Sequence, residues 1–158
     1  MATLTGIDLY KHYGHPKDLQ SKFIVWAVPV ELQKGKIPKK VYCHPDIIPH
    51  LQEGFKNLVD TNKWDELKTW DGVVNFRPIR GYESKYLDLM KNGKVEDAMK
   101  YLSIHSWGIA FDLNAATNGL GKKPTLSPEF VKCFTDAGFE WGGNWKRLDG
   151  MHFQLAKI

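Results

Sequence analysis

The stretch that decides the fold is SIHSWGIAFDLN, residues 103–114. It places His105 and Asp112 seven positions apart, with Gly108 between them. On a continuous helix the two side chains would share a face but lie about 10 Å apart along the axis. On a continuous strand they would point to opposite faces. We therefore expect a turn near residues 106–108, followed by a strand, so that His105 folds back over the element that carries Asp112.

One histidine follows this stretch, His152, in the sequence LDGMHFQ at residues 148–154. Together with His105 and Asp112 it would supply two imidazoles and one carboxylate, a donor set that suits zinc. Three protein ligands leave one tetrahedral position for water, as in catalytic sites. Asp149 lies three residues before His152 and is placed to accept a proton from that water. Spacing alone leaves open a purely structural role for His105 and Asp112.

Hydrophobic patterning and turn residues predict short elements around this stretch. We expect strands or extended segments at 23–28, 41–43, 107–113 and 151–156, and helices at 47–60, 130–137 and, as a pair around Asn92-Gly93, within 82–102. The helix at 130–137 would be capped by Ser127, with Pro128 in its first turn. The predicted fold class is α+β: one compact domain over residues 1–158, with a small antiparallel sheet carrying the metal site between flanking helices.

Composition narrows the choice of partners. The chain has 158 residues, of which 42% are hydrophobic, and a net charge of +4 with a pI near 9.0. This charge fits either an anionic partner or ordinary solubility. The lysines within 34–40 lack an accompanying glycine-rich or aromatic motif, so we expect no nucleic-acid partner. Cys43 and Cys133 are expected to be free thiols.

Residues 1–14 are polar and charged, without the apolar run of a secretion signal or membrane span. We therefore expect a protein that is made in the cytoplasm, does not insert stably into a membrane, and is a monomer. A wall-degrading role would require release or delivery to the wall.

The stretch at 103–112 matches the motif Ser-x-His-x-x-Gly-x-Ala-x-Asp in every specified place, and Asp149 and His152 match a second motif, an acid followed two residues later by histidine. At these residues the chain resembles the M15 peptidases, the zinc D-alanyl-D-alanine carboxypeptidases and L-alanyl-D-glutamate endopeptidases that include phage endolysins. Segments 70–72, 75–81 and 138–145 are similar to the phage-type branch. The resemblance covers roughly residues 28–154.

The resemblance implies roles for several residues. It implies one Zn²⁺ per chain, held by His105, Asp112 and His152, with Asp149 as general base. Arg77 matches the arginine that holds the substrate carbonyl or carboxylate, a role that suits the planar donors of a guanidinium. Arg80 is the competing candidate.

Four further residues are expected near the substrate or in the core. Trp145 lies close to Asp149, beside Gly142-Gly143, and is expected to touch substrate, as is Ser103 of the first motif. Of Trp107, Trp141 and Trp145, we expect two to be core residues. The charged excursion at 82–102 would shape the cleft.

The function predicted from these residues is cleavage of peptidoglycan stem peptides, between L-alanine and D-glutamate, because aspartate at position 149 resembles the endolysin endopeptidases. A D-alanyl-D-alanine carboxypeptidase is the alternative, in which Arg80 or a lysine of the excursion would bind the terminal carboxylate. A non-catalytic, zinc-supported wall-binding module is an alternative of another class. Asp149 argues against it, because such a module needs no carboxylate beside an open metal position.

Overall fold

The centre of the structure is an antiparallel sheet of four short strands, seen in a computed structural model that describes residues 2–158. Its strand order is β3 (Trp70–Gly72), β4 (Ala110–Leu113), β6 (His152–Leu155) and β5 (Phe139–Trp141). The two middle strands, β4 and β6, come from the two motif-bearing stretches of the sequence. The predicted α+β class, with a small antiparallel sheet between helices, is confirmed.

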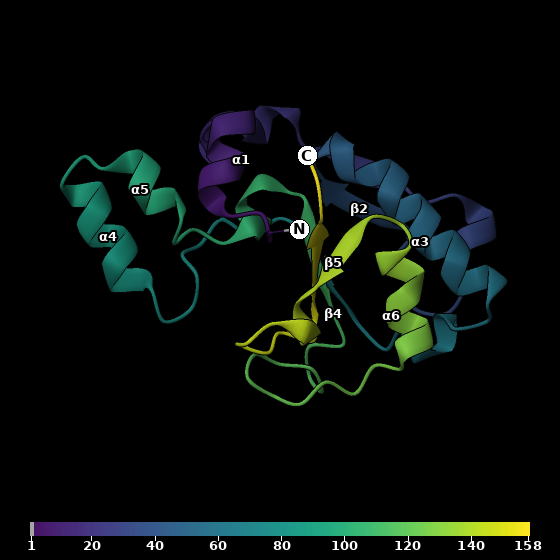
Figure 1. The fold of residues 1–158 in the computed structure, drawn as a ribbon. Helices are drawn as coiled ribbons and strands as arrows, with labels where there is room; N and C mark the ends of the chain where they lie inside the picture. The colour runs from purple at the N-terminus through teal and green to yellow at the C-terminus, as the bar shows by residue number, and fades with distance from the viewer. Residues whose placement is uncertain (1) are drawn as a thin grey trace.

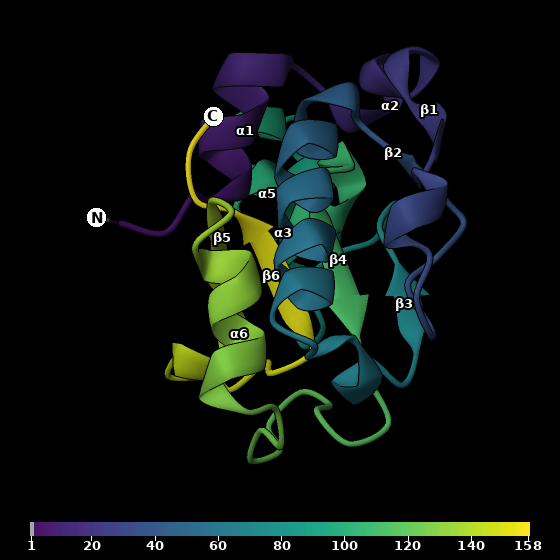
Figure 2. The same cartoon turned by 90° about the vertical axis from the view of Figure 1, so that its right-hand side faces the viewer.

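Two helices cover one face of this sheet. Helix α3 (Ile48–Asp60) and helix α6 (Pro128–Thr135) lie side by side in front of β4 and β6 (Figure 2). The core between them is aromatic: the ring centroid of Phe111 lies 5.0 Å from that of Phe134 and 5.1 Å from that of Phe153. All three side chains are fully buried. The hydrophobic effect and close packing of these rings fix the sheet against the helices.

Alternation along the middle strands places polar side chains on the other face. Because neighbouring strand residues point to opposite faces, burial of Phe111 and Phe153 toward the helices turns Asp112, His152 and Gln154 away from them. Asp112 and His152 are direct partners in the β4–β6 register. The sheet therefore brings the two motifs together on the face turned away from α3 and α6.

A second, two-stranded antiparallel sheet lies beside this core. It consists of β1 (Ile24–Ala27) and β2 (Lys40–Cys43), near the predicted segments. Trp26 of β1 stacks on Phe55 of α3, with ring centroids 6.2 Å apart. This contact ties the small sheet to the helical layer.

The chain before β1 forms two helices that residue patterning did not predict. Helix α1 (Gly6–Tyr13) begins at a capping box, in which Thr5 and Asp8 exchange hydrogen bonds. Helix α2 (Pro16–Leu19) follows directly. The remaining short segments are 3-10 turns: η1 (Gln20–Lys22), η2 (Val30–Leu32), η3 (Pro45–Ile47), η4 (Trp64–Glu66), η5 (Ile104–Trp107) and η6 (Gly142–Asn144).

The charged excursion at 82–102 stands away from the body of the molecule (Figure 1). It forms the two predicted short helices, α4 (Glu83–Lys91) and α5 (Val95–Met99), with Gly93 in the left-handed conformation between them. Helix α5 packs on α1. Helix α4 is fully described, and Tyr86 is its one buried side chain.

The strand predicted at 107–113 is correct only in its second half. Trp107 belongs to η5, and β4 begins at Ala110. The reason is local: Gly108 adopts a left-handed φ of 73° and separates the 3-10 turn from the strand. None of the helices described within 2–158 is long and apolar enough to span a membrane.

Candidate active site

Three side chains converge on one point of the sheet face turned away from α3 and α6. His105 comes from η5, Asp112 from β4 and His152 from β6. The Nε2 atom of His105 lies 3.1 Å from Oδ1 of Asp112, and Nδ1 of His152 lies 3.4 Å from the same oxygen. The two imidazole nitrogens are 3.2 Å apart. One ligand atom from each residue therefore lies within 4.8 Å of the others, as a shared metal ion requires.

The turn that carries His105 depends on its flanking residues. The hydroxyl of Ser103 accepts a hydrogen bond from the backbone N–H of His105 at 3.3 Å and caps η5. At the other end, Gly108 closes the turn in the left-handed region, and a Cβ added there would lie 2.9 Å from the backbone nitrogen of His44. The sequence analysis predicted a turn here, and the structure confirms it.

Hydrogen bonds on the outer side of each imidazole fix which nitrogen faces the cluster. Nδ1 of His105 lies 2.7 Å from the carbonyl oxygen of Val73, which can only accept, so the proton sits on Nδ1. Nε2 of His152 lies 2.8 Å from Oε1 of Gln154, whose amide nitrogen in turn donates to the carbonyl of Leu4 at 3.4 Å. Each neutral ring thus presents a lone pair to the centre of the cluster, the orientation that outer hydrogen bonds give to metal ligands.

This arrangement fits a metal ion. Two nitrogen lone pairs 3.2 Å apart have no proton to share when both outer nitrogens are protonated, so a cation is the species that satisfies both. Burial disfavours ionisation of Asp112, yet the proximity of His105 and His152 holds the pKa of this carboxyl well below its usual range. The donor set is therefore two neutral imidazoles and an ionised carboxylate, which suits zinc better than magnesium or calcium.

Asp149 lies beside the cluster with a carboxylate oxygen that is buried and has no hydrogen-bond partner among the described residues. Burial raises the pKa of Asp149, while the nearby His152 opposes this shift. A buried acceptor without a partner costs free energy. Such a group is therefore available to accept a proton from a molecule bound at the site.

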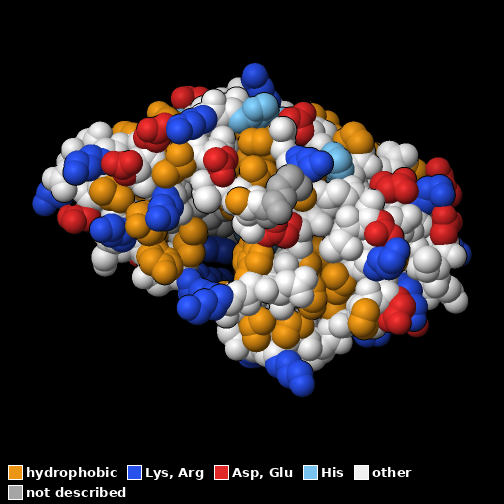
Figure 3. Space-filling view, viewed as in Figure 1, with side chains coloured by type: hydrophobic (Ala, Val, Ile, Leu, Met, Phe, Trp, Pro, Cys, Tyr) orange, Lys and Arg blue, Asp and Glu red, His pale blue; other side chains and the backbone are white. Residues whose placement is uncertain are grey.

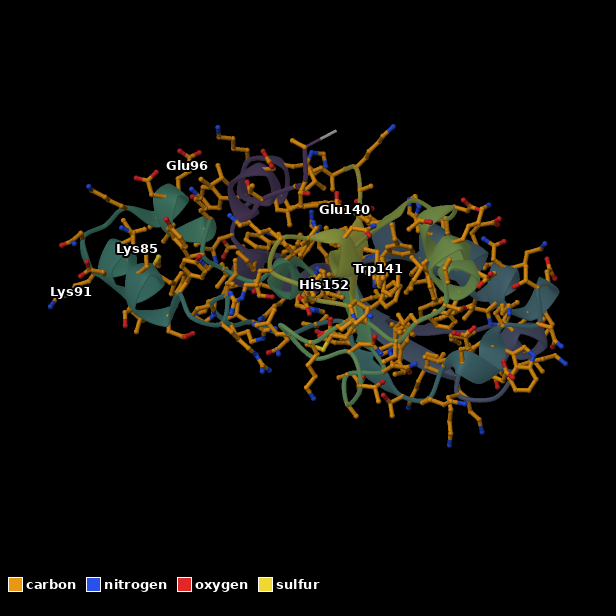
Figure 4. All side chains as sticks on the ribbon, turned by 60° about the horizontal axis from the view of Figure 1, so that its bottom comes forward. Lys85, Lys91, Glu96, Glu140, Trp141 and His152 are labelled. Atoms are coloured by element: carbon orange, nitrogen blue, oxygen red, sulfur yellow. The ribbon has the colours of Figure 1, made fainter. Side chains whose placement is uncertain are left out.

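A cleft of about 360 Å³ opens over the cluster, and we call it the cleft hereafter. Figure 3 shows it as a hollow between the excursion and the body of the molecule, with basic side chains in it and on its rim. His152 lies near the middle of the molecule, far from Lys91 at the tip of the excursion (Figure 4). Of the predicted site residues the cleft is lined by Arg77, Arg80, Ser103, His105, Trp145, Asp149 and His152. Asp112 is not among its lining residues.

The two candidate arginines occupy different depths. Arg77 is partly buried; its Nη1 atom donates to the carbonyl oxygen of Pro78 at 3.3 Å, and its Nε atom is buried without a partner among residues 2–158. Burial and the nearby Arg80 lower the pKa of Arg77, while Asp112 and Asp149 raise it. Arg80 is exposed. Arg77 therefore lies electrostatically closer to the acids of the site.

The three tryptophans near the motifs differ in burial and in their distance from the cleft. Trp107 is fully buried, and Trp141 is partly buried with its indole N–H donated to the carbonyl of Gly150 at 2.8 Å. Trp145 lines the cleft, its ring centroid 5.3 Å from that of His152. Its indole N–H donates to a carboxylate oxygen of Glu140 at 2.7 Å. This position is compatible with the predicted contact with substrate, which remains a prediction for Trp145 and for Ser103.

Three residues of the site were not predicted from the sequence. Gln154 orients His152, and the N-terminal residue Leu4 accepts from Gln154 and lines the cleft. Arg147 also lines the cleft. Its place two residues before Asp149 was the one available signal, whereas the contact with Leu4 joins residues 150 positions apart and leaves no local pattern.

Comparison with known proteins gives one match to a family model. The model described as D-alanyl-D-alanine carboxypeptidase, of the M15 peptidases, matches residues 96–155. No match was found among curated proteins. Among solved structures, the L-Ala D-Glu endopeptidase ChiX of Serratia marcescens matches with 19% identity and a TM-score of 0.36, covering 72% of this chain and 80% of that one.

The family match falls on the segment that matters most for the site. It contains both motifs, and with them His105, Asp112, Asp149 and His152. The resemblance to the M15 peptidases is thereby confirmed over residues 96–155.

Proposed function

We propose that this chain is a zinc-dependent peptidase that cleaves the stem peptides of bacterial peptidoglycan between L-alanine and D-glutamate, as endolysins do. The observation that carries the proposal is the pairing of a three-ligand cluster with an unpartnered, buried carboxylate, Asp149, in one cleft. A structural metal site would need a fourth ligand and no such carboxylate. The proposal treats residues 1–158 as one peptidase domain.

His105, Asp112 and His152 would hold the ion. When bound, zinc would supply a Lewis acid that polarises the scissile carbonyl and lowers the pKa of water. Asp149 takes the proton of the attacking water and afterwards gives it to the leaving amine, so that base and acid alternate on one carboxyl group. The raised pKa of Asp149 favours the first transfer, because a more basic carboxylate accepts a proton more readily.

Arg77 would hold the oxygen on which negative charge develops. Its partly buried guanidinium has an unused Nε donor, and a planar fork of donors suits an oxyanion or carboxylate. Burial strengthens this interaction, because charges interact more strongly where water is excluded.

The experiment is digestion of a synthetic stem peptide, with the products separated by mass spectrometry. We expect release of a fragment that begins with D-glutamate, loss of activity after chelation, and recovery on adding one equivalent of zinc. Metal content below about half an equivalent after purification without chelator would contradict the metal assignment.

The alternative within the family is a D-alanyl-D-alanine carboxypeptidase, which the matching family description favours. It predicts release of free D-alanine from the same peptide. The two products differ in mass, so one digestion separates the two activities.

A further inference from the structure

Arginine is distributed unevenly in this protein. The chain has 22 basic residues, of which three are arginines: Arg77, Arg80 and Arg147. All three line the cleft, whereas Lys100 is the one lysine that does so. The remaining lysines lie elsewhere on the chain, including Lys85 and Lys91 on the excursion (Figure 4). The residue type best suited to bidentate binding of carboxylates is thus confined to a single cavity.

These cations are not balanced by acids of the cleft. Asp149 is the one carboxylate among the lining residues, against four basic side chains. No ion pair joins Arg80, Lys100 or Arg147 to an acid within residues 2–158. The nearby carboxylate of Glu83 is occupied by the backbone N–H of Gly81, to which both its oxygens bond at 2.9 and 2.8 Å. Arg80, Lys100 and Arg147 therefore have no acidic side chain in contact with them among the described residues.

Depth divides the four cations into two groups. Arg77 is partly buried next to the acids of the metal cluster, whereas Arg80, Lys100 and Arg147 are exposed at the mouth of the cleft. They come from three segments: the turn before α4, the end of α5 and the loop before Asp149. The Nη2 atom of Arg147 lies 3.6 Å from the position a Cβ would take on Gly81, so the loop and the turn approach each other here.

We propose that Arg80, Lys100 and Arg147 form an outer anion subsite, which binds a carboxylate of an acidic peptide at a distance from the bond that is cut. Arg77 would then serve the reacting carbonyl alone. This inference rests on the proposed peptidase function and narrows its substrate class: the preferred peptide has a free carboxylate outside the reaction centre, and the same peptide with a carboxamide there binds less well.

The test compares two synthetic stem peptides that differ only in this group, carboxylate or carboxamide, at equal zinc content. We expect the carboxamide to raise KM about 10-fold or more with little change in kcat, since exposed charge-assisted hydrogen bonds act mainly on binding. The preference should decrease between about 50 mM and 500 mM salt, because exposed charges are screened.

Variants locate the subsite. Arg80→Gln and Arg147→Gln together should abolish the preference, and each alone should reduce it about 3-fold. Lys91→Gln removes the same charge at the far end of α4 and should keep the preference in full, which controls for net charge. Thermal unfolding checks folding; both arginines are exposed, so little loss of stability is expected.

Equal KM values for the two peptides in the wild type, or an unchanged preference in the double variant, would overturn the inference. If neither peptide is cut, titration calorimetry of the same pair separates the two proposals. A carboxylate preference in Kd that the double variant loses then supports the subsite while the peptidase proposal fails. Equal Kd values in that case overturn the subsite as well.

Discussion

The middle strands of the sheet and the α4–α5 excursion are held in place differently. On β4 and β6 every residue except Asp112 is buried, and the helices α3 and α6 hold these strands from behind. On α4 one side chain is buried, and Leu87 is 62% exposed. Reaction chemistry needs fixed geometry, whereas a wall that selects substrates tolerates change. We therefore expect the chemistry to depend on the sheet and the excursion to tolerate substitution.

The largest difference in turnover is expected between substitutions of two aspartates, Asp149 beside the metal-ligand cluster and Asp97 on α5. Asp149→Asn should reduce turnover by about 100- to 10,000-fold, because amide replaces the proton acceptor. Zinc content should stay near one equivalent, since Asp149 is not in the cluster. Asp97→Asn, on exposed α5, should leave turnover unchanged. Loss of zinc in Asp149→Asn, measured by metal analysis, would show that Asp149 is a ligand.

The free energy of unfolding should also respond differently to substitutions in the sheet and in the excursion. Phe111→Ala removes a fully buried ring that contacts Phe134, Phe139 and Phe153, and should lower the free energy of unfolding by about 3–5 kcal/mol. Leu87→Ala on α4 should change it by less than about 0.5 kcal/mol. Urea unfolding followed by fluorescence measures both. Comparable losses for the two variants would mean that the excursion is as tightly packed as the sheet.

Substitutions of Arg77 and Arg80 test whether the partly buried and the exposed arginine of the cleft have different roles. Arg77→Lys keeps the charge but not the planar fork, and should cost about 2–4 kcal/mol of transition-state stabilisation with zinc still bound. Arg80→Lys keeps the charge of an exposed group and should cost much less. Values of kcat/KM on the stem peptide measure both effects. Reversed effects would place the oxyanion contact on Arg80.

A smaller effect, on zinc affinity, is expected from substitution of Gln154, which orients the metal ligand His152. Gln154→Leu removes the acceptor for Nε2 of His152, and should weaken zinc binding about 10- to 100-fold, as loss of an outer hydrogen bond to a ligand does. Competition with a chelator of known affinity gives the value. Gln154→Glu keeps an acceptor and should retain the affinity; equal loss in both variants would point to altered packing.

Local signals predicted much of this architecture. Ser127 and Pro128 marked the start of α6, the glycine-centred turn after His105 followed from geometry, and the alternation at 151–156 indicated β6. The capping box at Thr5 and Asp8 is also present in the sequence, but the eight residues of α1 are too few for a clear helical hydrophobic pattern. Strand β5 was matched only as a family-like segment, because three residues are too short for an alternation signal.

The candidate site also contains residues that the sequence predicts and residues that it does not. Its ligand trio and Asp149 could be selected because motifs keep them at fixed spacing along the chain. The roles of Val73 and Leu4 could not, because they act through backbone carbonyls, which no residue type records. Arg147 was visible beside Asp149, but its approach to Gly81 depends on how two distant loops fold.

The confinement of arginine to one cavity has a consequence for chemical labelling. A dicarbonyl reagent that modifies guanidinium groups can react with this protein at three side chains, and all of them line the cleft. Exposed Arg80 and Arg147 should be modified before the partly buried Arg77. A reagent that normally marks a whole surface would therefore report on one cavity, and protection by a bound ligand could be read from intact mass alone.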